Sequence, residues 1–361
     1  MYTMPILLPL SLAMLGSISA QPSTSPPNST AQPVPVTTPR QDADPARLAD
    51  AEAHYPTEVT AKTLADPKAL AALQASGKVL FSDGFESADA LKAAFEVLGL
   101  PEGRVKLTSR SKYAHSGSAA LQLTAPANGG KSIGAGPTYW FGAAKDGGGQ
   151  DRVYLRYYLK FADDYDQGNL NHTGASLAAV ASSNMWEGMG NAGIRPKGND
   201  RFTVGFEPWR DWGRHEPPGV MHLYTYWMDM RRDRDGHFWG NMFIPEPADR
   251  INPKRGEWHC YEQMIKANTP GQADGELAAW IDGKLYTHFT GFRWRTTPDV
   301  KLKRFSLSIY VHQSTRDNVV WYDDVVLSTG YVGTIPPPTT PESPAGKPTA
   351  APTVEKPRER P

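Results

Sequence analysis

The feature that most constrains this chain is a strict alternation of apolar and polar residues. In the segment 304–312, RFSLSIYVH, every second residue is apolar, and serine, tyrosine and histidine occupy positions between them. Only a β-strand, whose side chains point alternately to two faces, separates residues in this way. The segments 151–161 (DRVYLRYYLKF) and 219–230 (GVMHLYTYWMDM) show the same period. The pattern predicts strands that each bury one face.

The stretch from residue 78 to residue 332 consists mainly of such segments, separated by clusters of Gly, Pro, Asn and Asp. No long helical pattern interrupts them. We therefore expect one all-β domain over residues 78–332, an antiparallel two-sheet β-jelly-roll sandwich. One short helix is expected near residues 67–76, because Asp66 and Pro67 precede KALAALQ and Gly77 follows it.

The two ends of the chain differ in composition from this domain. Residues 1–20 contain a short apolar run that ends in small residues, as a secretory signal peptide does. The expected linker over 21–77 and the expected tail over 333–361 are rich in proline, which predicts disorder outside the short helix. These patterns predict a secreted or periplasmic protein that does not insert into the membrane after signal removal.

The charge balance argues against a nucleic-acid partner. Lys plus Arg and Asp plus Glu number 38 each, so the chain has no net charge to attract a polyanion over its whole surface. Cys260 is the one cysteine and cannot form an internal disulfide, and its place in a strand-like segment predicts a buried side chain. The sequence makes no prediction of the oligomeric state.

The alternation along the strands places residues with reactive side chains on the same face. His222, Tyr224 and Tyr226 share the polar side of one strand, and Tyr310 and His312 share the polar side of another. Aromatic and imidazole side chains can stack on a sugar ring, donate hydrogen bonds and move protons. The alternative is an ordinary solvated face of an antiparallel sheet.

The segments that open and close the domain, FSDGFES at 81–87 and VVWYDDVVLS at 319–328, resemble the first and last strands of concanavalin A-like jelly rolls. SKYAHSGSAALQL at 111–123 resembles their second hairpin. The resemblance implies a structural Ca²⁺ ion at the ends of the terminal strands, with Glu86 and Asp324 as ligands and Asp83 and Asp323 behind them. The alternative is that these acids cap turns or face water. No organic cofactor is expected.

A closer resemblance, over 151–332, is to polysaccharide lyases of family 14 and related jelly-roll lyases. It rests on VYLRYYLKF, on RFTVGFEPWR followed by a Gly-bearing loop and YTY, and on YEQMIKANTPGQADGELAAWIDGKL. It implies that the strand beginning at Tyr261 is a cleft strand and that the Tyr-x-Tyr pair, Tyr224 and Tyr226, moves the protons of β-elimination. The end of the last element, residues 281–284, is also typical of an ordinary hairpin turn.

The chain departs from the family pattern where a serine, an arginine and a lysine usually stand. Its upstream strand points Thr203, Gly205 and Glu207 outward, and the earlier segment has His172. We expect His172 to replace the lysine, and Arg195 or Arg210 to supply positive charge from loops. The expected catalytic residues are Tyr224, Tyr226, His172, His312 and Arg195. The expected substrate-binding residues are His222, Glu207, Trp209, Arg210, Lys266, Tyr310 and Gln313.

These observations favour a polysaccharide as the partner and a β-eliminating lyase of uronic-acid polymers as the function. A non-catalytic carbohydrate-binding module is the main alternative, because stacking by Trp209, Trp212 or Trp227 serves either function. The near balance of eight basic and seven acidic residues in 195–235 counts against a lyase. A glycoside hydrolase needs paired carboxylates, and the Glu-x-Asp-x-x-Glu run of laminarinase-like jelly rolls is missing.

Overall fold

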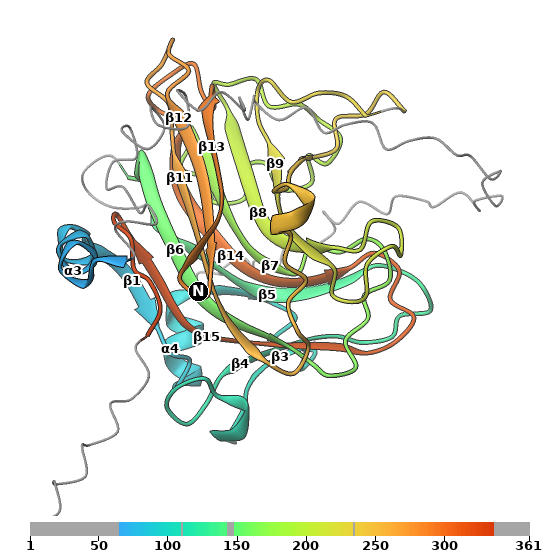
Figure 1. The fold of residues 1–361 in the computed structure, drawn as a ribbon. Coiled ribbons are helices and arrows are strands. Elements are labelled where there is room, and N and C mark those ends of the chain that lie inside the picture. Colours follow the sequence, from blue (N-terminus) through green and yellow to red (C-terminus); the bar gives the residue numbers. More distant parts are fainter. Residues whose placement is uncertain (1–64, 110, 143–147, 234, 336–361) are drawn as a thin grey trace, which may run out of the picture.

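The computed structural model describes residues 65–109, 111–142, 148–233 and 235–335. The expected signal peptide and most of both expected linker segments lie outside these ranges. The described part folds into two antiparallel β-sheets that form the layers of a sandwich (Figure 1). The predicted all-β jelly-roll class is thereby confirmed.

The first sheet has eight strands. They are β1 (Val79–Asp83), β3 (Val105–Leu107), β4 (Leu121–Ala125), β6 (Arg152–Phe161), β11 (Trp258–Lys266), β12 (Gly275–Ile281), β13 (Lys284–Phe292) and β15 (Asn318–Ser328). Their order is β13-β12-β11-β6-β15-β4-β3, and β1 also pairs with β15. The terminal strands β1 and β15 therefore lie side by side, as the concanavalin A-like resemblance implied.

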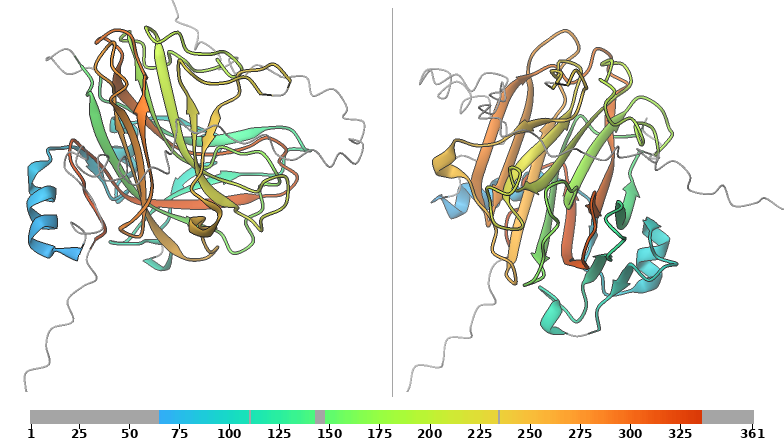
Figure 2. Two further views of the ribbon diagram at one scale, coloured as in Figure 1. Left: turned by 45° about the horizontal axis from the view of Figure 1, so that its top comes forward. Right: turned by 90° about the vertical axis from the view of Figure 1, so that its right-hand side faces the viewer.

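The second sheet has seven strands. They are β2 (Glu96–Leu98), β5 (Ile133–Trp140), β7 (Gly174–Val180), β8 (Arg201–Trp209), β9 (Val220–Tyr226), β10 (Asn241–Phe243) and β14 (Lys301–Val311). Their order is β10-β9-β8-β7-β14-β5-β2. The further views in Figure 2 show both curved layers from other sides.

The helices within the described ranges are short and peripheral. They are α3 (Pro67–Ser76), α4 (Ala88–Ala94) and the 3₁₀ turns η1 (Ser111–Tyr113) and η2 (Pro247–Asp249). Helix α3 is capped by Asp66, and its Leu70 and Leu73 pack on the large sheet beside Tyr154 and Trp280. It lies near β1 and away from β8 and β9 (Figure 1). Among the described residues, no helix is long and apolar enough to cross a membrane.

The core between the sheets is built by the alternation in the sequence. On β14, Phe305, Leu307 and Ile309 are fully buried, whereas Ser308 and Tyr310 on the opposite face are partly exposed. The same parity holds along β9. Trp227, one of the tryptophans expected to stack on sugar, is instead a core residue whose ring lies 4.9 Å from that of Phe292.

Strand β11, which the lyase resemblance implied to be a cleft strand, lies in the other sheet from β8, β9 and β14. It pairs with β6 and β12 in the eight-stranded sheet. Tyr261 and Ile265 point into the core, so the alternate residue Lys266 lies on the outer face of that sheet. The residue pattern of this segment specifies a strand but not the sheet that it joins.

The pairing register of the strands determines which side chains lie beside one another on the outer face. On the neighbouring strands β8 and β9, Glu207 lies opposite His222 and Gly205 lies opposite Tyr224. Strand β7 separates β8 from β14, which carries Tyr310. The polar faces of β8, β9 and β14 are therefore parts of one continuous sheet surface.

Candidate functional site

Tyrosine and histidine side chains, with one glutamate, gather on the outer face of the seven-stranded sheet. Strands β8, β9 and β14 supply most of them, one residue precedes β7, and one follows β14. We call the group the tyrosine–histidine cluster. Its members are His172, Glu207, His222, Tyr224, Tyr226, Tyr310 and His312.

The centre of the cluster is a carboxylate–imidazole pair. His172 Nδ1 lies 2.9 Å and 3.2 Å from the two carboxylate oxygens of Glu207. The Glu207 side chain is only 8 % exposed, whereas that of His172 is 40 % exposed. Burial acts to lower the pKa of His172, but the charge of Glu207 and its hydrogen bond outweigh burial and raise that pKa. The pair therefore favours the protonated form of His172 relative to a free imidazole.

The other two histidines favour the neutral form. Burial lowers the pKa of His222 to about 4, and its Nε2 lies 4.0 Å from Glu207 Oε1. Burial and the neighbouring charge of His172 lower the pKa of His312 to about 4 as well. The His312 ring lies 5.2 Å from the His172 ring and 5.0 Å from the Tyr310 ring. The pKa of one imidazole on this face is thus raised by Glu207, whereas the pKa values of the other two are lowered by burial.

The tyrosine pair occupies the β9 side of the cluster. The rings of Tyr224 and Tyr226 lie 5.7 Å apart, and the backbone N–H of Gly240 donates a 2.9 Å hydrogen bond to the Tyr224 hydroxyl. Burial raises the pKa of Tyr224 well above its ordinary value, and the neighbouring Tyr226 adds to that increase. A side chain at Gly240 would meet the Tyr224 ring at 2.6 Å. Tyr224 is thus a fixed, neutral phenol that lies against Tyr226.

The backbone before β7 is tied to β14. The Ser308 hydroxyl donates to the carbonyl oxygen of His172 at 2.9 Å, and the His172 N–H donates to the carbonyl oxygen of Tyr310 at 2.8 Å. Sequence analysis did not identify Ser308 or Gly240 as supports. Ser308 shares its parity with Tyr310 and could have been found from the alternation, whereas nothing in the local sequence marks Gly240.

Five of the expected site residues lie outside the cluster. Trp209 borders it, with its ring 6.3 Å from that of His222, and Gln313 follows His312 in an exposed turn. The guanidinium group of Arg210 donates a 2.8 Å hydrogen bond to the carboxylate of Asp166.

The remaining two also have partners outside the cluster. Lys266, on the other sheet, pairs with Glu276 at 2.8 Å. Arg195 is exposed on the loop after β7, with its guanidinium carbon 5.4 Å from the centre of the Phe238 ring. The two arginines expected to supply positive charge therefore contact Phe238 and Asp166.

The expected calcium ligands are engaged by the segment 115–119. Glu86 accepts hydrogen bonds from the backbone and hydroxyl of Ser118, and Asp324 accepts from Ser116 Oγ and His115 Nδ1, both at 2.7 Å. Within the described ranges, no group of three or more His, Cys, Asp or Glu side chains is arranged to hold a metal ion. These residues alone do not form a cation cage, and calcium binding stays a prediction.

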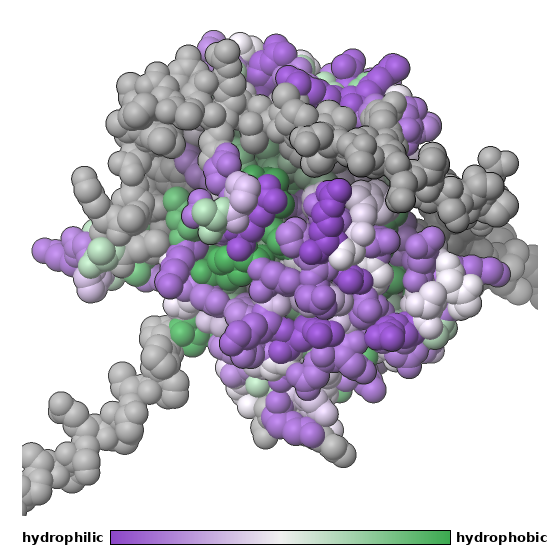
Figure 3. All heavy atoms as spheres, turned by 45° about the vertical axis from the view of Figure 1, so that its right-hand side comes forward, coloured by the Kyte–Doolittle hydropathy of each residue, from purple (hydrophilic) through white to green (hydrophobic). Residues whose placement is uncertain are grey.

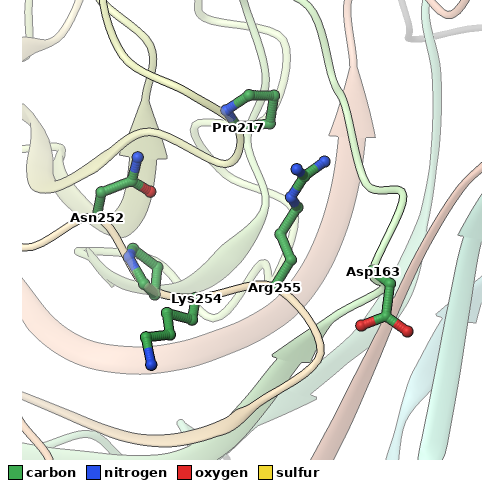
Figure 4. A pocket seen from close by; sticks show the side chains of 6 residues that line it. Asp163, Pro217, Asn252, Lys254 and Arg255 are labelled. Carbon is green, nitrogen blue, oxygen red and sulfur yellow. The ribbon is translucent and has the colours of Figure 1, made fainter.

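A shallow pocket of ≈ 410 Å³ lies elsewhere (Figure 4). Its lining residues are Asp163, Pro217, Asn252, Pro253, Lys254 and Arg255. No member of the tyrosine–histidine cluster lines it. The cluster lies on the outer face of the seven-stranded sheet, where His172 and Tyr310 are partly exposed and His222 and Glu207 are buried.

No protein-family model matches the chain, and no curated protein matches it. Among solved structures it is similar to a family 14 alginate lyase from Aplysia kurodai, with a TM-score of 0.51 and 15 % identity over 69 % of this chain and 98 % of that one. An alginate lyase from a Chlorella virus gives a TM-score of 0.49 at 15 % identity over 70 % of this chain and all of that one. A glucuronan lyase from Trichoderma reesei gives 0.42 at 13 % identity over 70 % and 96 %. At these identities the likeness shows the fold: the chain is a jelly roll of the kind found in polysaccharide lyases.

Proposed function

We propose that this protein is an exported lyase that cleaves a uronic-acid-containing polysaccharide by β-elimination at the tyrosine–histidine cluster. The observation that carries the proposal is a row of contacting rings on a single sheet face, in which His312 lies against His172, His172 against Tyr224 and Tyr224 against Tyr226. These are the groups that a proton-transfer reaction on an anionic sugar requires. The jelly-roll fold shared with the Aplysia alginate lyase supports the same choice of substrate class.

The reaction moves two protons. A base removes the proton at C5 of the uronate, the electrons of that bond form the C4=C5 double bond, and the C4–O bond breaks. The departing oxygen takes a proton from an acid. In the proposed assignment, neutral His312 is the base and the Tyr226 phenol is the acid, while Tyr224 positions Tyr226. Binding of an anionic sugar beside His312 favours its protonation, which offsets part of the effect of burial.

His172 has a different role in this proposal. Removal of the C5 proton places negative charge on the uronate carboxylate, and a cation facing that group stabilises the transition state. The half-exposed imidazole of His172 supplies the cation when it is protonated, and the buried carboxylate of Glu207 raises its pKa. The pair thus replaces the lysine that the lyase resemblance implied.

Non-catalytic glycan binding is the second candidate, and one observation favours it. The outward residues Thr203, Gly205 and Glu207 of β8 differ from the serine and arginine that the resemblance implied on this strand, and Glu207 brings a carboxylate to it. A hydrolase has less support, because Glu207 is the single carboxylate in the cluster as defined and glycoside hydrolysis uses two.

The test is ultraviolet absorbance of the unsaturated uronate during incubation with alginate, glucuronan and pectate. The lyase proposal expects absorbance to rise with at least one polymer and to disappear with His312→Ala. Wild-type protein that binds a polymer without any rise in absorbance would be a binding module.

A further inference from the structure

Two loops meet at the Tyr226 end of the cluster. The loop 181–200 joins β7 to β8, and the loop 227–240 joins β9 to β10. Gly193 and Phe238 form a β-bridge between these loops, and Trp239 packs close to Gly193. The adjoining Gly240 donates the hydrogen bond to the Tyr224 hydroxyl. The paired loops are therefore fastened directly to the cluster.

Two arginines project from these loops onto one aromatic ring. The guanidinium carbons of Arg195 and Arg232 lie 5.4 Å and 4.9 Å from the centre of the Phe238 ring, and both side chains are exposed. We call Arg195, Arg232, Phe238 and Trp239 the arginine rim. A ring that supports two guanidinium groups limits their freedom, so binding an anion there costs less conformational entropy than at two free arginines.

One acidic residue of the loop 227–240, Asp229, is paired with a basic residue. It accepts two hydrogen bonds from Arg293, at 2.8 Å and 2.9 Å. Asp233 accepts hydrogen bonds from the backbone N–H groups of Asp235 and His237. The exposed guanidinium groups of Arg195 and Arg232 therefore lie in a loop region of mixed charge.

Exposed aromatic side chains complete the rim. Trp239 is 38 % exposed, and Trp186 of the loop 181–200 is 43 % exposed. Most of the surface that is coloured in Figure 3 is hydrophilic. A flat indole offers a stacking surface to a sugar ring, and a guanidinium can hold a carboxylate through two hydrogen bonds. Together they match a sugar that carries a carboxylate.

We propose that the arginine rim is a second binding site for the polysaccharide, which holds the carboxylates of uronate residues beyond the one bound at the cluster. The inference rests on the proposed function for the class of polymer. It adds that the protein recognises several consecutive acidic sugars and that affinity rises with chain length. Salt should weaken this binding, because the contacts are exposed charge pairs.

The experiment measures binding of saturated uronate oligosaccharides by calorimetry, in the His312→Ala background so that cleavage does not consume the ligand. The double substitution Arg195→Gln and Arg232→Gln should weaken binding of a hexasaccharide about tenfold, which corresponds to about 1.4 kcal/mol. Binding of a single uronate sugar at the cluster should keep its affinity. The control is Arg214→Gln, an exposed arginine paired with Asp211 on the loop between β8 and β9.

Unchanged hexasaccharide affinity in the double variant would overturn the inference. So would an equal loss with Arg214→Gln, since that result would reflect overall charge alone. Absence of binding by the parent protein would overturn it as well. The proposed function fails on a different result, the lack of an unsaturated product from the protein with His312 intact, so the two failures are distinguishable.

Discussion

Replacing Tyr226 by phenylalanine tests its role in catalysis separately from its role in stability. The substitution removes one hydroxyl from a half-buried ring and keeps its packing. Loss of a positioned proton donor typically lowers a rate by about 10²–10⁴-fold, or about 3–5 kcal/mol of transition-state stabilisation. The hydroxyl contributes only about 1 kcal/mol to stability, which is about 2–4 °C in melting temperature for a domain of this size.

The assay follows the unsaturated product under substrate saturation, with melting measured on the same samples. Tyr224→Phe is the matched comparison, because it removes the acceptor of the Gly240 N–H. Leaving that donor without a partner costs about 1–3 kcal/mol, so Tyr224→Phe should melt lower than Tyr226→Phe. Product formation at the wild-type rate in Tyr226→Phe would refute the assignment of Tyr226 as the acid.

The remaining predictions concern charge, the cation and the core. Glu207→Gln removes the group that raises the pKa of His172. Activity is lost at alkaline pH when His172 loses its proton, so this loss should move to lower pH in the variant. A pH–rate profile that does not move would contradict this role. If Glu86 and Asp324 bind Ca²⁺, a chelator should lower the melting temperature of the wild type but not of Glu86→Ala, and identical wild-type curves with and without chelator would remove the site. Leu307→Ala, at a fully buried position, should cost about 2–5 kcal/mol in urea unfolding, and a cost below about 1 kcal/mol would show that this part of the core is loosely packed.

The sheet and much of the cluster could be predicted from the sequence for the same reason. A period of two decides both which side chains form the core and which share the outer face. Met221 and Leu223 are buried by that rule, and His222, Tyr224 and Tyr226 take the other face. Glu207 was placed outward on β8 by the same parity, and its register opposite His222 brings the two together.

The rest depends on contacts between distant segments, which local patterns do not specify. The alternation along its strand places Lys266 on an outer face, as expected. That strand, however, belongs to the eight-stranded sheet and not to the sheet that carries the cluster. Arg195 and Arg210 lie on loops, where the partners Phe238 and Asp166 determine their direction. The opposite pKa shifts of His172 and His312 arise because burial lowers both pKa values but only His172 has a hydrogen bond to Glu207, a contact that a sequence does not contain.

The most direct test of the central claim is the mass of the oligosaccharides released from a uronate polymer by the wild-type protein. Elimination leaves an unsaturated sugar at the new non-reducing end, so each such fragment is lighter by one water than the product of hydrolysis. The account predicts these lighter fragments, together with their loss in Tyr226→Phe. Fragments with the hydrolytic mass, or intact polymer that is bound but not cleaved, would contradict it.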